Sequence, residues 1–133
     1  MAKAKIVKQL LVTTPNEVGT LNKISTTLVQ AGLNLKHLCA STFGEQAVFM
    51  VILDNHEKAK ELLENFEYEV ILKDALEVEF KNQPGTLSLV AQKLADADID
   101  VKYIYGTSSD GETVIGVFST NDNKKAVNLI NLE

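Results

Sequence analysis

The chain contains an internal repeat. Residues 16–55 align without a gap on residues 82–121, at a period of 66. Ten of these forty aligned pairs are identical, whereas unrelated segments of ordinary composition share roughly two or three. The alignment predicts two copies of one small unit, over residues 1–72 and 73–133. The identical pairs are Asn16/Asn82, Gly19/Gly85, Thr20/Thr86, Leu21/Leu87, Leu28/Leu94, Ala31/Ala97, Lys36/Lys102, Val48/Val114, Val51/Val117 and Asn55/Asn121.

Composition narrows the class of protein. Of the 133 residues, 45% are hydrophobic and 23% are charged, which is ordinary for a globular chain. The formal net charge of −5 argues against a nucleic-acid partner, because such proteins favour a basic face. The single cysteine, Cys39, excludes an internal disulfide. No apolar run approaches the roughly 18 residues of a membrane span, and the N-terminal segment lacks a signal-peptide pattern. We therefore expect a cytoplasmic protein without a membrane partner.

The second repeat has the clearer secondary-structure pattern. Residues 76–80 alternate apolar and charged side chains, which is typical of a half-buried strand. The segment 82–85 breaks this strand, and apolar residues then recur at helical spacing from Leu87 to Leu94. Two further strands are expected over 101–107 and 113–119, followed by a short helix over 123–130.

The first repeat shows the same order. Strands are expected over 6–14, 35–43, 47–53 and 68–72, with one helix before Gly32 and a second reaching Phe66. The order β-α-β-β-α-β indicates an α+β fold of two ferredoxin-like units packed side by side. The second unit lacks most of its last strand, because the sequence ends at Glu133.

Two features favour a homodimer. The missing strand would leave residues 76–80 as an exposed sheet edge, which proteins seldom tolerate unprotected. The segment 48–53 is apolar on both faces of its strand, so a second layer is expected to cover it.

Two short motifs resemble those of the ACT domain, a regulatory ligand-binding module of many enzymes of amino-acid metabolism. The first motif, Asn or Asp followed by any residue, Pro-Gly, any residue and Leu, matches Asn82-Gln83-Pro84-Gly85-Thr86-Leu87. The second matches Ala31-Gly32-Leu33-Asn34-Leu35. Over residues 5–130 the chain resembles stand-alone tandem ACT proteins, which have no catalytic domain and are regarded as amino-acid-binding. The resemblance implies a sensor with a free amino acid as ligand and an unidentified regulated enzyme as a further partner.

The chain departs from the family pattern at three positions. Val18 stands where the family prefers Pro, which loosens that loop. Asp98 stands where Gly is usual, and Asp can still adopt the left-handed backbone conformation. Asp100 stands where Asn is usual and adds a charge to the implied site.

The repeated motif fits the chemistry of a free amino acid. A carboxylate binds backbone N–H groups at a helix start, and a glycine there lets the ligand approach closely. An ammonium needs oxygen acceptors such as Asn side chains or a carboxylate. The resemblance implies one site joining Asn82 to Asn34 and another joining Asn16 to Asp100. The expected ligand-binding residues are Asn16, Val18, Gly19, Thr20, Leu21, Asn34, Asn82, Pro84, Gly85, Thr86, Leu87 and Asp100.

Structural roles compete with binding at these positions. Asn16 and Asn82 could simply close turns, and both glycines serve a tight turn with or without a ligand. Asn34 and Asp100 could be solvated residues at strand starts. His37 and His56 share no metal-ligand spacing with other residues, so we expect no metal and no cofactor.

Two other classes of function remain open. An enzyme is disfavoured, because the sequence has no acid/base cluster, nucleophile motif or phosphate loop. The alternative to a sensor is a ferredoxin-like module that binds nucleic acid or protein without a small ligand. Tyr103 and Tyr105 share a strand face, as in RNA-binding sheets, but no basic surface accompanies them.

Overall fold

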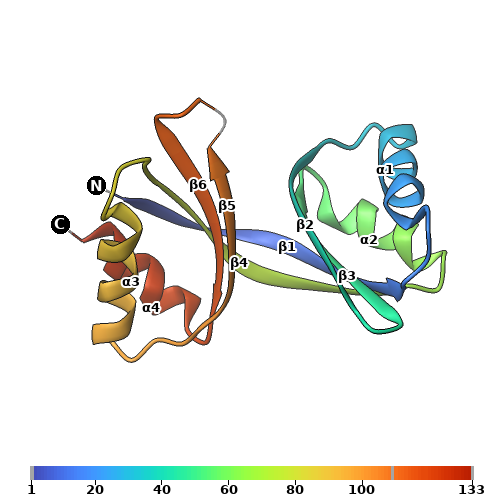
Figure 1. The fold of residues 1–133 in the computed structure, drawn as a ribbon. Helices are drawn as coiled ribbons and strands as arrows, with labels where there is room; N and C mark the ends of the chain where they lie inside the picture. The colour runs from blue at the N-terminus through green and yellow to red at the C-terminus, as the bar shows by residue number, and fades with distance from the viewer. Residues whose placement is uncertain (1, 109, 133) are drawn as a thin grey trace. The chain divides into compact units, whose positions relative to one another are not determined.

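A computed structural model describes residues 2–108 and 110–132. It has the expected α+β composition, with antiparallel strands and helices in the order β-α-β-β-α-β-α-β-β-α (Figure 1). The elements are β1 (Lys3–Pro15), α1 (Thr20–Gln30), β2 (Leu35–Phe43), β3 (Gln46–Leu53), α2 (His56–Glu64), β4 (Glu69–Lys81), α3 (Thr86–Asp96), β5 (Val101–Ser108), β6 (Thr113–Thr120) and α4 (Asn123–Asn131).

The chain forms two compact units. The first unit is Lys8–Lys73, and the second unit is Asp74–Glu133 together with Met1–Val7. Strands β1 and β4 have 13 residues each and contribute to both units. The sequence pattern predicted separate strands over 68–72 and 76–80, but β4 runs through both. No Gly or Pro interrupts the intervening residues 73–75, so nothing in the backbone stops the strand.

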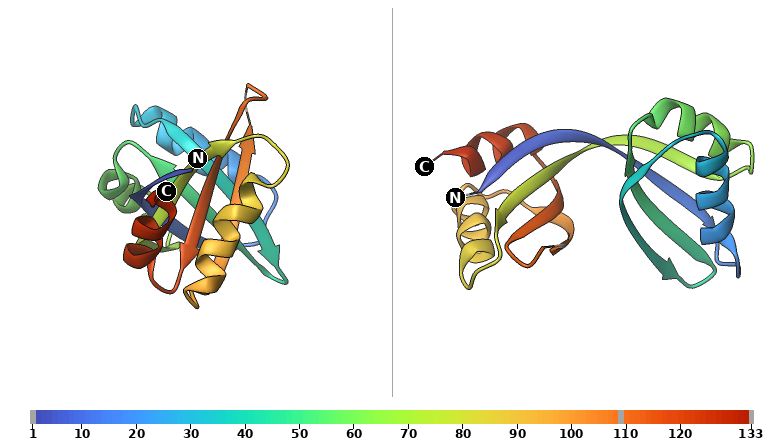
Figure 2. Two further views of the ribbon diagram at one scale, coloured as in Figure 1. Left: turned by 90° about the vertical axis from the view of Figure 1, so that its left-hand side faces the viewer. Right: turned by 90° about the horizontal axis from the view of Figure 1, so that it is seen from above.

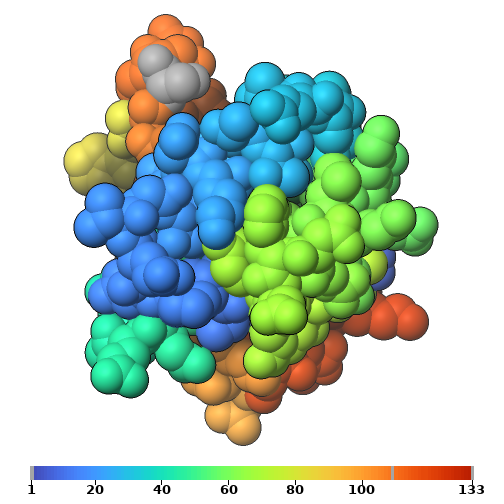
Figure 3. All heavy atoms as spheres, turned by 90° about the vertical axis from the view of Figure 1, so that its right-hand side faces the viewer, coloured from blue at the N-terminus to red at the C-terminus, as the bar shows by residue number. Residues whose placement is uncertain are grey.

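The first unit has the strand order β2-β3-β1-β4, with β3 antiparallel to β1 and β2. Helices α1 and α2 cover one face of this sheet (Figure 2), and Figure 3 shows the unit from its helical side, with α1 in blue and α2 in green. The buried stripe of α1, which includes Ile24 and Leu28, faces a core of strand residues. The core residues are Leu10, Val12, Ile24, Leu28, Ala47, Phe49, Val51, Leu53, Ala59, Leu63 and Val70.

The second unit has the strand order β1-β4-β6-β5. The N-terminal part of β1 takes the place of the strand that was expected to be missing after α4. Ala4 packs against the core of this unit, its N–H donates to Oδ1 of Asn131 at 2.7 Å, and its carbonyl accepts from Nδ2 of Asn131 at 2.9 Å. Lys5 forms an ion pair with Glu77 at 3.2 Å. Residues 76–80 therefore have a neighbouring strand on each side, and the expectation that they form an exposed edge is wrong.

The repeat changes its period at the hairpins. Pro15 pairs with Gln46 in the first unit, and Lys81 pairs with Thr113 in the second. Pro15 and Lys81 are 66 positions apart, whereas their partners Gln46 and Thr113 are 67 apart. The second hairpin is one residue longer, and the gapless alignment is wrong beyond this point. The identities Val48/Val114, Val51/Val117 and Asn55/Asn121 are not structurally equivalent. The equivalent pairs include Gly44/Gly111, Glu45/Glu112 and Ala59/Ala126.

The first helix of each unit ends in the same hydrogen-bonded turn. Gly32 has a φ of 74° and closes α1, with Leu33 N–H donating to the carbonyl of Leu28 at 2.9 Å. Asp98, with a φ of 57°, does the same for α3, as its ability to adopt this conformation predicted. By contrast, α2 ends at Glu64, two residues before the predicted Phe66.

Candidate functional site

The loop between β1 and α1 is tied to the tip of the hairpin formed by β2 and β3. The backbone N–H of Asn16 donates to the carbonyl of Glu45 at 2.8 Å, and its side-chain Nδ2 donates to the carbonyl of Gly44 at 3.3 Å. These bonds use the backbone N–H and one of the two side-chain N–H groups of Asn16. Its Oδ1 accepts no hydrogen bond from the described residues, so this oxygen can accept one from a ligand.

The equivalent loop of the second unit has the same arrangement. Asn82 N–H donates to the carbonyl of Glu112 at 2.8 Å, and Asn82 Nδ2 donates to the carbonyl of Gly111 at 3.1 Å. Closing the loop is thus a structural role of both asparagines. That role is compatible with binding, because it uses their donors and leaves their acceptor oxygens.

Helices α1 and α3 begin without side-chain caps. Their N-cap residues are Gly19 and Gly85, with φ angles of 92° and 90°, and no acidic residue lies in either first turn. A Cβ at either glycine would meet open space, so backbone conformation rather than crowding requires Gly here. In contrast, Asn55 caps α2 and Asp122 caps α4 through their side chains. The starts of α1 and α3 therefore keep the positive end of the helix dipole open to an anion.

The other loop residues divide into structural and exposed ones. Thr20 Oγ1 donates to the carbonyl of Glu17 at 3.0 Å, and Thr86 Oγ1 donates to that of Gln83 at 2.9 Å. Both hydroxyl groups hold the loop closed. Val18, Leu21, Pro84 and Leu87 are exposed, Val18 completely, and could contact a bound molecule.

Asn34 and Asp100 lie at the other end of the first helix of their own units. Each residue donates its backbone N–H to a side chain after the hairpin: Asn34 to Asp54 at 3.2 Å and Asp100 to Asn121 at 3.0 Å. An 11-residue helix is about 16 Å long. Asn16 and Asn34 of the first unit are therefore far apart, and so are Asn82 and Asp100 of the second. The pairing of Asn82 with Asn34 and of Asn16 with Asp100 stays a prediction.

The hairpin tips are part of the loop environment and were missed as site residues. Gly44-Glu45 and Gly111-Glu112 are identical in the two repeats, but the gapless alignment conceals this. Beside the second tip, Asp110 Oδ1 accepts the N–H groups of Thr113 and Glu112 at 3.0 and 2.8 Å. These bonds lower the pKa of the Asp110 carboxyl, so it stays ionised and adds negative charge to the hairpin tip.

The described residues contain no cluster of three or more His, Cys, Asp and Glu side chains placed to hold a metal ion. His56 instead has a structural role, since its Nε2 accepts the backbone N–H of Leu53 at 3.2 Å. Partial burial, followed by the charge of Lys36, lowers the pKa of His56. None of the helices in the described part of the chain is long and apolar enough to cross a membrane.

The fold and the loop geometry together define a class of protein, a pair of ferredoxin-like modules. Each unit is a ferredoxin-like α+β module, with an uncapped helix start beside its first strand. The family model of the ACT domain pair matches residues 5–133, and the chain belongs to this family.

Solved structures agree with this fold. Protein BT0572 from Bacteroides thetaiotaomicron is 22% identical with a TM-score of 0.87, covering 95% of this chain and 87% of that one. The regulatory subunit of aspartate kinase from Thermus thermophilus, in its ligand-free form, is 14% identical with a TM-score of 0.71, covering 95% of both chains. The corresponding subunit from Thermus flavus is 17% identical with a TM-score of 0.66, covering 96% and 94%. No curated protein matches the chain significantly.

Proposed function

We propose that this protein is a non-catalytic regulatory module that binds a free amino acid at the loops containing Asn16 and Asn82. Membership of the ACT family supports a regulatory role for a small ligand. The similarity to regulatory subunits of aspartate kinase is consistent with that role. A cytoplasmic location suits such a sensor, and its output requires a separate enzyme as partner.

The observation that carries the proposal is the pairing, in both units, of an uncapped helix start with an asparagine acceptor. The ligand's carboxylate accepts hydrogen bonds from backbone N–H groups at Gly19–Leu21, or from those of Gly85 and Leu87. The N–H of Thr86 already donates to the carbonyl of Gln83 at 3.3 Å. Its ammonium donates to Oδ1 of Asn16 or Asn82. These are the two groups that every free amino acid presents, so the loop recognises the class, and the surrounding side chains select the member.

A panel of the twenty amino acids tests the proposal by thermal shift. A ligand at 100 times its dissociation constant stabilises the folded protein by about 2.7 kcal/mol. For a chain of this size that raises the melting temperature by roughly 5–10 °C. A panel at millimolar concentration in which no amino acid shifts the melting temperature by more than about 1 °C would contradict the proposal.

The two loops are expected to bind unequally. Pro84 stiffens the loop of Asn82, which limits the entropy lost on binding, whereas the loop of Asn16 contains Val18. The expected pairing of Asn82 with Asn34 would carry no formal charge and would suit a neutral amino acid. Asn82→Ala should weaken binding by about 1–3 kcal/mol, and Asn16→Ala should weaken it less. Calorimetry measures both, with Asn128→Ala, an exposed position on α4, as the control that changes nothing.

Because Asn82 also holds the hairpin tip, the stability of each variant without ligand is measured separately by urea unfolding. A stable Asn82→Ala variant that binds as tightly as the parent would show that the site lies elsewhere. A larger loss from Asn16→Ala would reverse the order of the two loops.

We also propose a homodimer, on the strand order and on the apolar side chains exposed beside its ends. Strand β2 lies at one edge of the sheet of the first unit, and β5 lies at one edge of the sheet of the second unit. Exposed apolar side chains accompany each edge: Leu21 and Leu38 in the first unit, and Leu87 and Ile104 in the second. A second copy would bury such edges.

Light scattering at micromolar concentration should give twice the chain mass, and Leu38→Lys with Ile104→Lys should shift it to the monomer. A monomeric mass for the parent protein would refute the dimer.

A further inference from the structure

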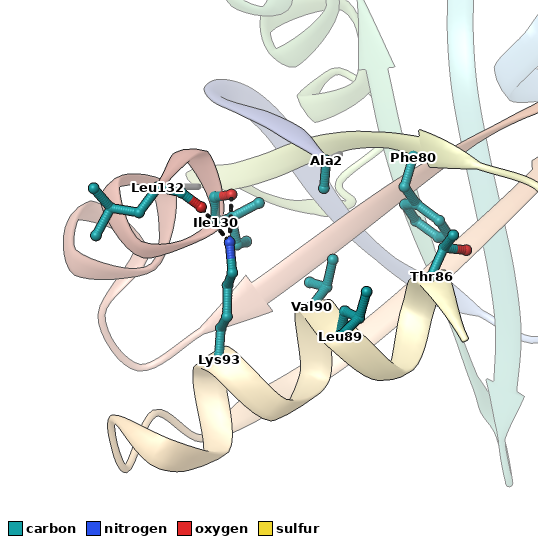
Figure 4. Close-up of a pocket in the computed structure, with 8 residues that line it drawn as sticks. All are labelled: Ala2, Phe80, Thr86, Leu89, Val90, Lys93, Ile130 and Leu132. Carbon is teal, nitrogen blue, oxygen red and sulfur yellow. Dashed lines mark hydrogen bonds between the residues drawn. The ribbon is translucent and has the colours of Figure 1, made fainter.

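A cavity of about 320 Å³ lies between α3 and α4 of the second unit (Figure 4). Its walls are mainly apolar: Phe80 at the end of β4, Leu89 and Val90 on α3, Ile130 on α4, and Ala2 just before β1. Thr86 at the start of α3 also lines it, so the cavity borders the loop of Asn82 without including the hairpin tip that Asn82 contacts. Family membership and the loop geometry assign no role to it.

Lys93 is the charged residue among those that line the cavity. Its Nζ donates to the backbone carbonyls of Ile130, at 3.3 Å, and Leu132, as the dashed lines in Figure 4 show. An ammonium carries three donors, so one remains for an anion after these two bonds. The hydroxyl of Thr86, which also lines the cavity, is already bonded to the carbonyls of Lys81 and Gln83. The cavity thus combines an apolar body with one cationic group.

The first unit has an aromatic ring at one of the corresponding positions. The period of 66 puts Ala2 at the strand position of Tyr68, and Leu89 at the helix position of Lys23. Phe66 and Tyr68 lie with their ring centroids 5.5 Å apart, and Lys23 Nζ lies 5.0 Å from the first ring and 5.8 Å from the second. The second unit has alanine at the strand position and therefore lacks this ring.

A second pair of residues supports the equivalence of Ala2 and Tyr68. The period of 66 places Ala4 at the position of Val70, and each of these residues packs against the core of its own unit. The side chain that the second unit lacks at this strand position is therefore aromatic.

We propose that this cavity binds a small carboxylic acid that carries an aromatic ring. The ring takes the place that the Tyr68 ring occupies in the first unit, and the carboxylate accepts a charge-assisted hydrogen bond from Lys93. The volume is adequate, because an apolar cavity of about 150 Å³ is enough to bind benzene. The proposal does not depend on amino-acid binding at the Asn16 and Asn82 loops.

The test uses 3-phenylpropanoate as the probe and the full chain as the protein. Calorimetry should give a dissociation constant in the range of about 0.1–1 mM. The neutral analogue 3-phenylpropan-1-ol should bind about tenfold more weakly, because it lacks the carboxylate. In amide NMR spectra, the probe should shift the signals of Leu89, Val90 and Ile130 and leave those of the first unit unchanged.

Four variants locate the site. Ala2→Tyr restores the residue found in the first unit and fills the cavity, so it should weaken binding at least about tenfold. Lys93→Met should have an effect of similar size. Because Lys93→Met also removes the hydrogen bonds to the end of α4, Lys93→Arg serves as the charge-conserving variant and should retain binding. Lys23→Met, a matched lysine change on α1, should leave binding unchanged.

The following results would overturn the proposal. They are absence of binding below about 10 mM, equal binding of the acid and the alcohol, and full binding by a folded Ala2→Tyr variant. Probe-induced shifts confined to the Gly19 and Gly85 loops would likewise place the carboxylate at the helix starts and not in this cavity.

Discussion

In the first unit, the N–H of Leu53 at the end of β3 donates to Nε2 of His56 at 3.2 Å. In the second unit, the N–H of Thr120 at the end of β6 donates to Oδ1 of Asn123 at 3.0 Å. Leu53 is equivalent to Thr120, and His56 to Asn123, because each pair is 67 positions apart. A ring nitrogen in one copy and an amide oxygen in the other thus meet the same backbone requirement, which is to satisfy the N–H where a strand passes into a helix. Only the histidine makes that bond sensitive to pH.

The comparison extends to the helix ends and the space around the helices. Gly32 and Asp98 close α1 and α3 with the same bonds, at different conformational cost. Tyr68 and Ala2 occupy equivalent strand positions, yet Tyr68 lies against a second ring, that of Phe66, whereas Ala2 lines a cavity. The backbone hydrogen bonds of the fold are therefore kept in both units, while the side chains around them have diverged.

The largest expected effect comes from truncating the core of either unit. Leu28 and Leu94 are equivalent residues, each 1% exposed. Leu28→Ala and Leu94→Ala should each lower the free energy of unfolding by about 3 kcal/mol. Because β1 and β4 contribute to both units, we expect one cooperative transition in urea for each variant, as monitored by circular dichroism. Two separate transitions, with only one shifted by each variant, would show that the units unfold independently. Val29→Ala, on the exposed side of α1, is the control.

A smaller effect is expected at the ends of the first helices. Gly32→Ala places a Cβ on a residue with a φ of 74° and should lower the free energy of unfolding by about 1 kcal/mol or more. Asp98→Gly relieves the same conformation but raises the entropy of the unfolded chain, so it should stabilise by less than about 1 kcal/mol. Urea unfolding of both variants checks the sign. Destabilisation by Asp98→Gly would mean that the Asp98 side chain stabilises the turn.

The smallest effect concerns pH and the first unit alone. The pKa of His56 is lowered mainly by burial and then by Lys36, with a further contribution from Lys8, against the opposing charge of Asp54. The folded state therefore binds the proton less readily than the unfolded state. The stabilising contribution of neutral His56 should be complete above the unfolded pKa of about 6.5. It should be lost as the pH falls from there through the folded pKa.

Urea unfolding at several pH values across this range tests the prediction. His56→Asn, which introduces the residue type of the second unit, should flatten the pH dependence of stability in this window. A parent protein and variant with the same slope would show that His56 does not cause it.

Several features of the fold and the loops could be predicted because they depend on neighbouring residues. The apolar spacing from Leu87 to Leu94 predicted α3, and Gly32 marked the end of α1. The period of 66 matched Asn16 with Asn82, and both asparagines do close equivalent turns. The contact of each asparagine with its hairpin tip could not be predicted, because the residues involved are 28 and 29 positions apart.

The sequence by itself determined the two repeats, the α+β class and the tight turns at Gly19 and Gly85. Turn geometry and the periodicity of apolar residues are local properties that a few adjacent residues specify. Only the tertiary structure decided that the N-terminal part of β1 completes the second unit, where Ala4 meets Asn131 across 127 positions. It also decided that the hairpins differ by one residue, and that Ala2 lines a cavity between α3 and α4. Strand partners and filled volume depend on hydrogen bonds and packing between distant segments, and no local pattern specifies these.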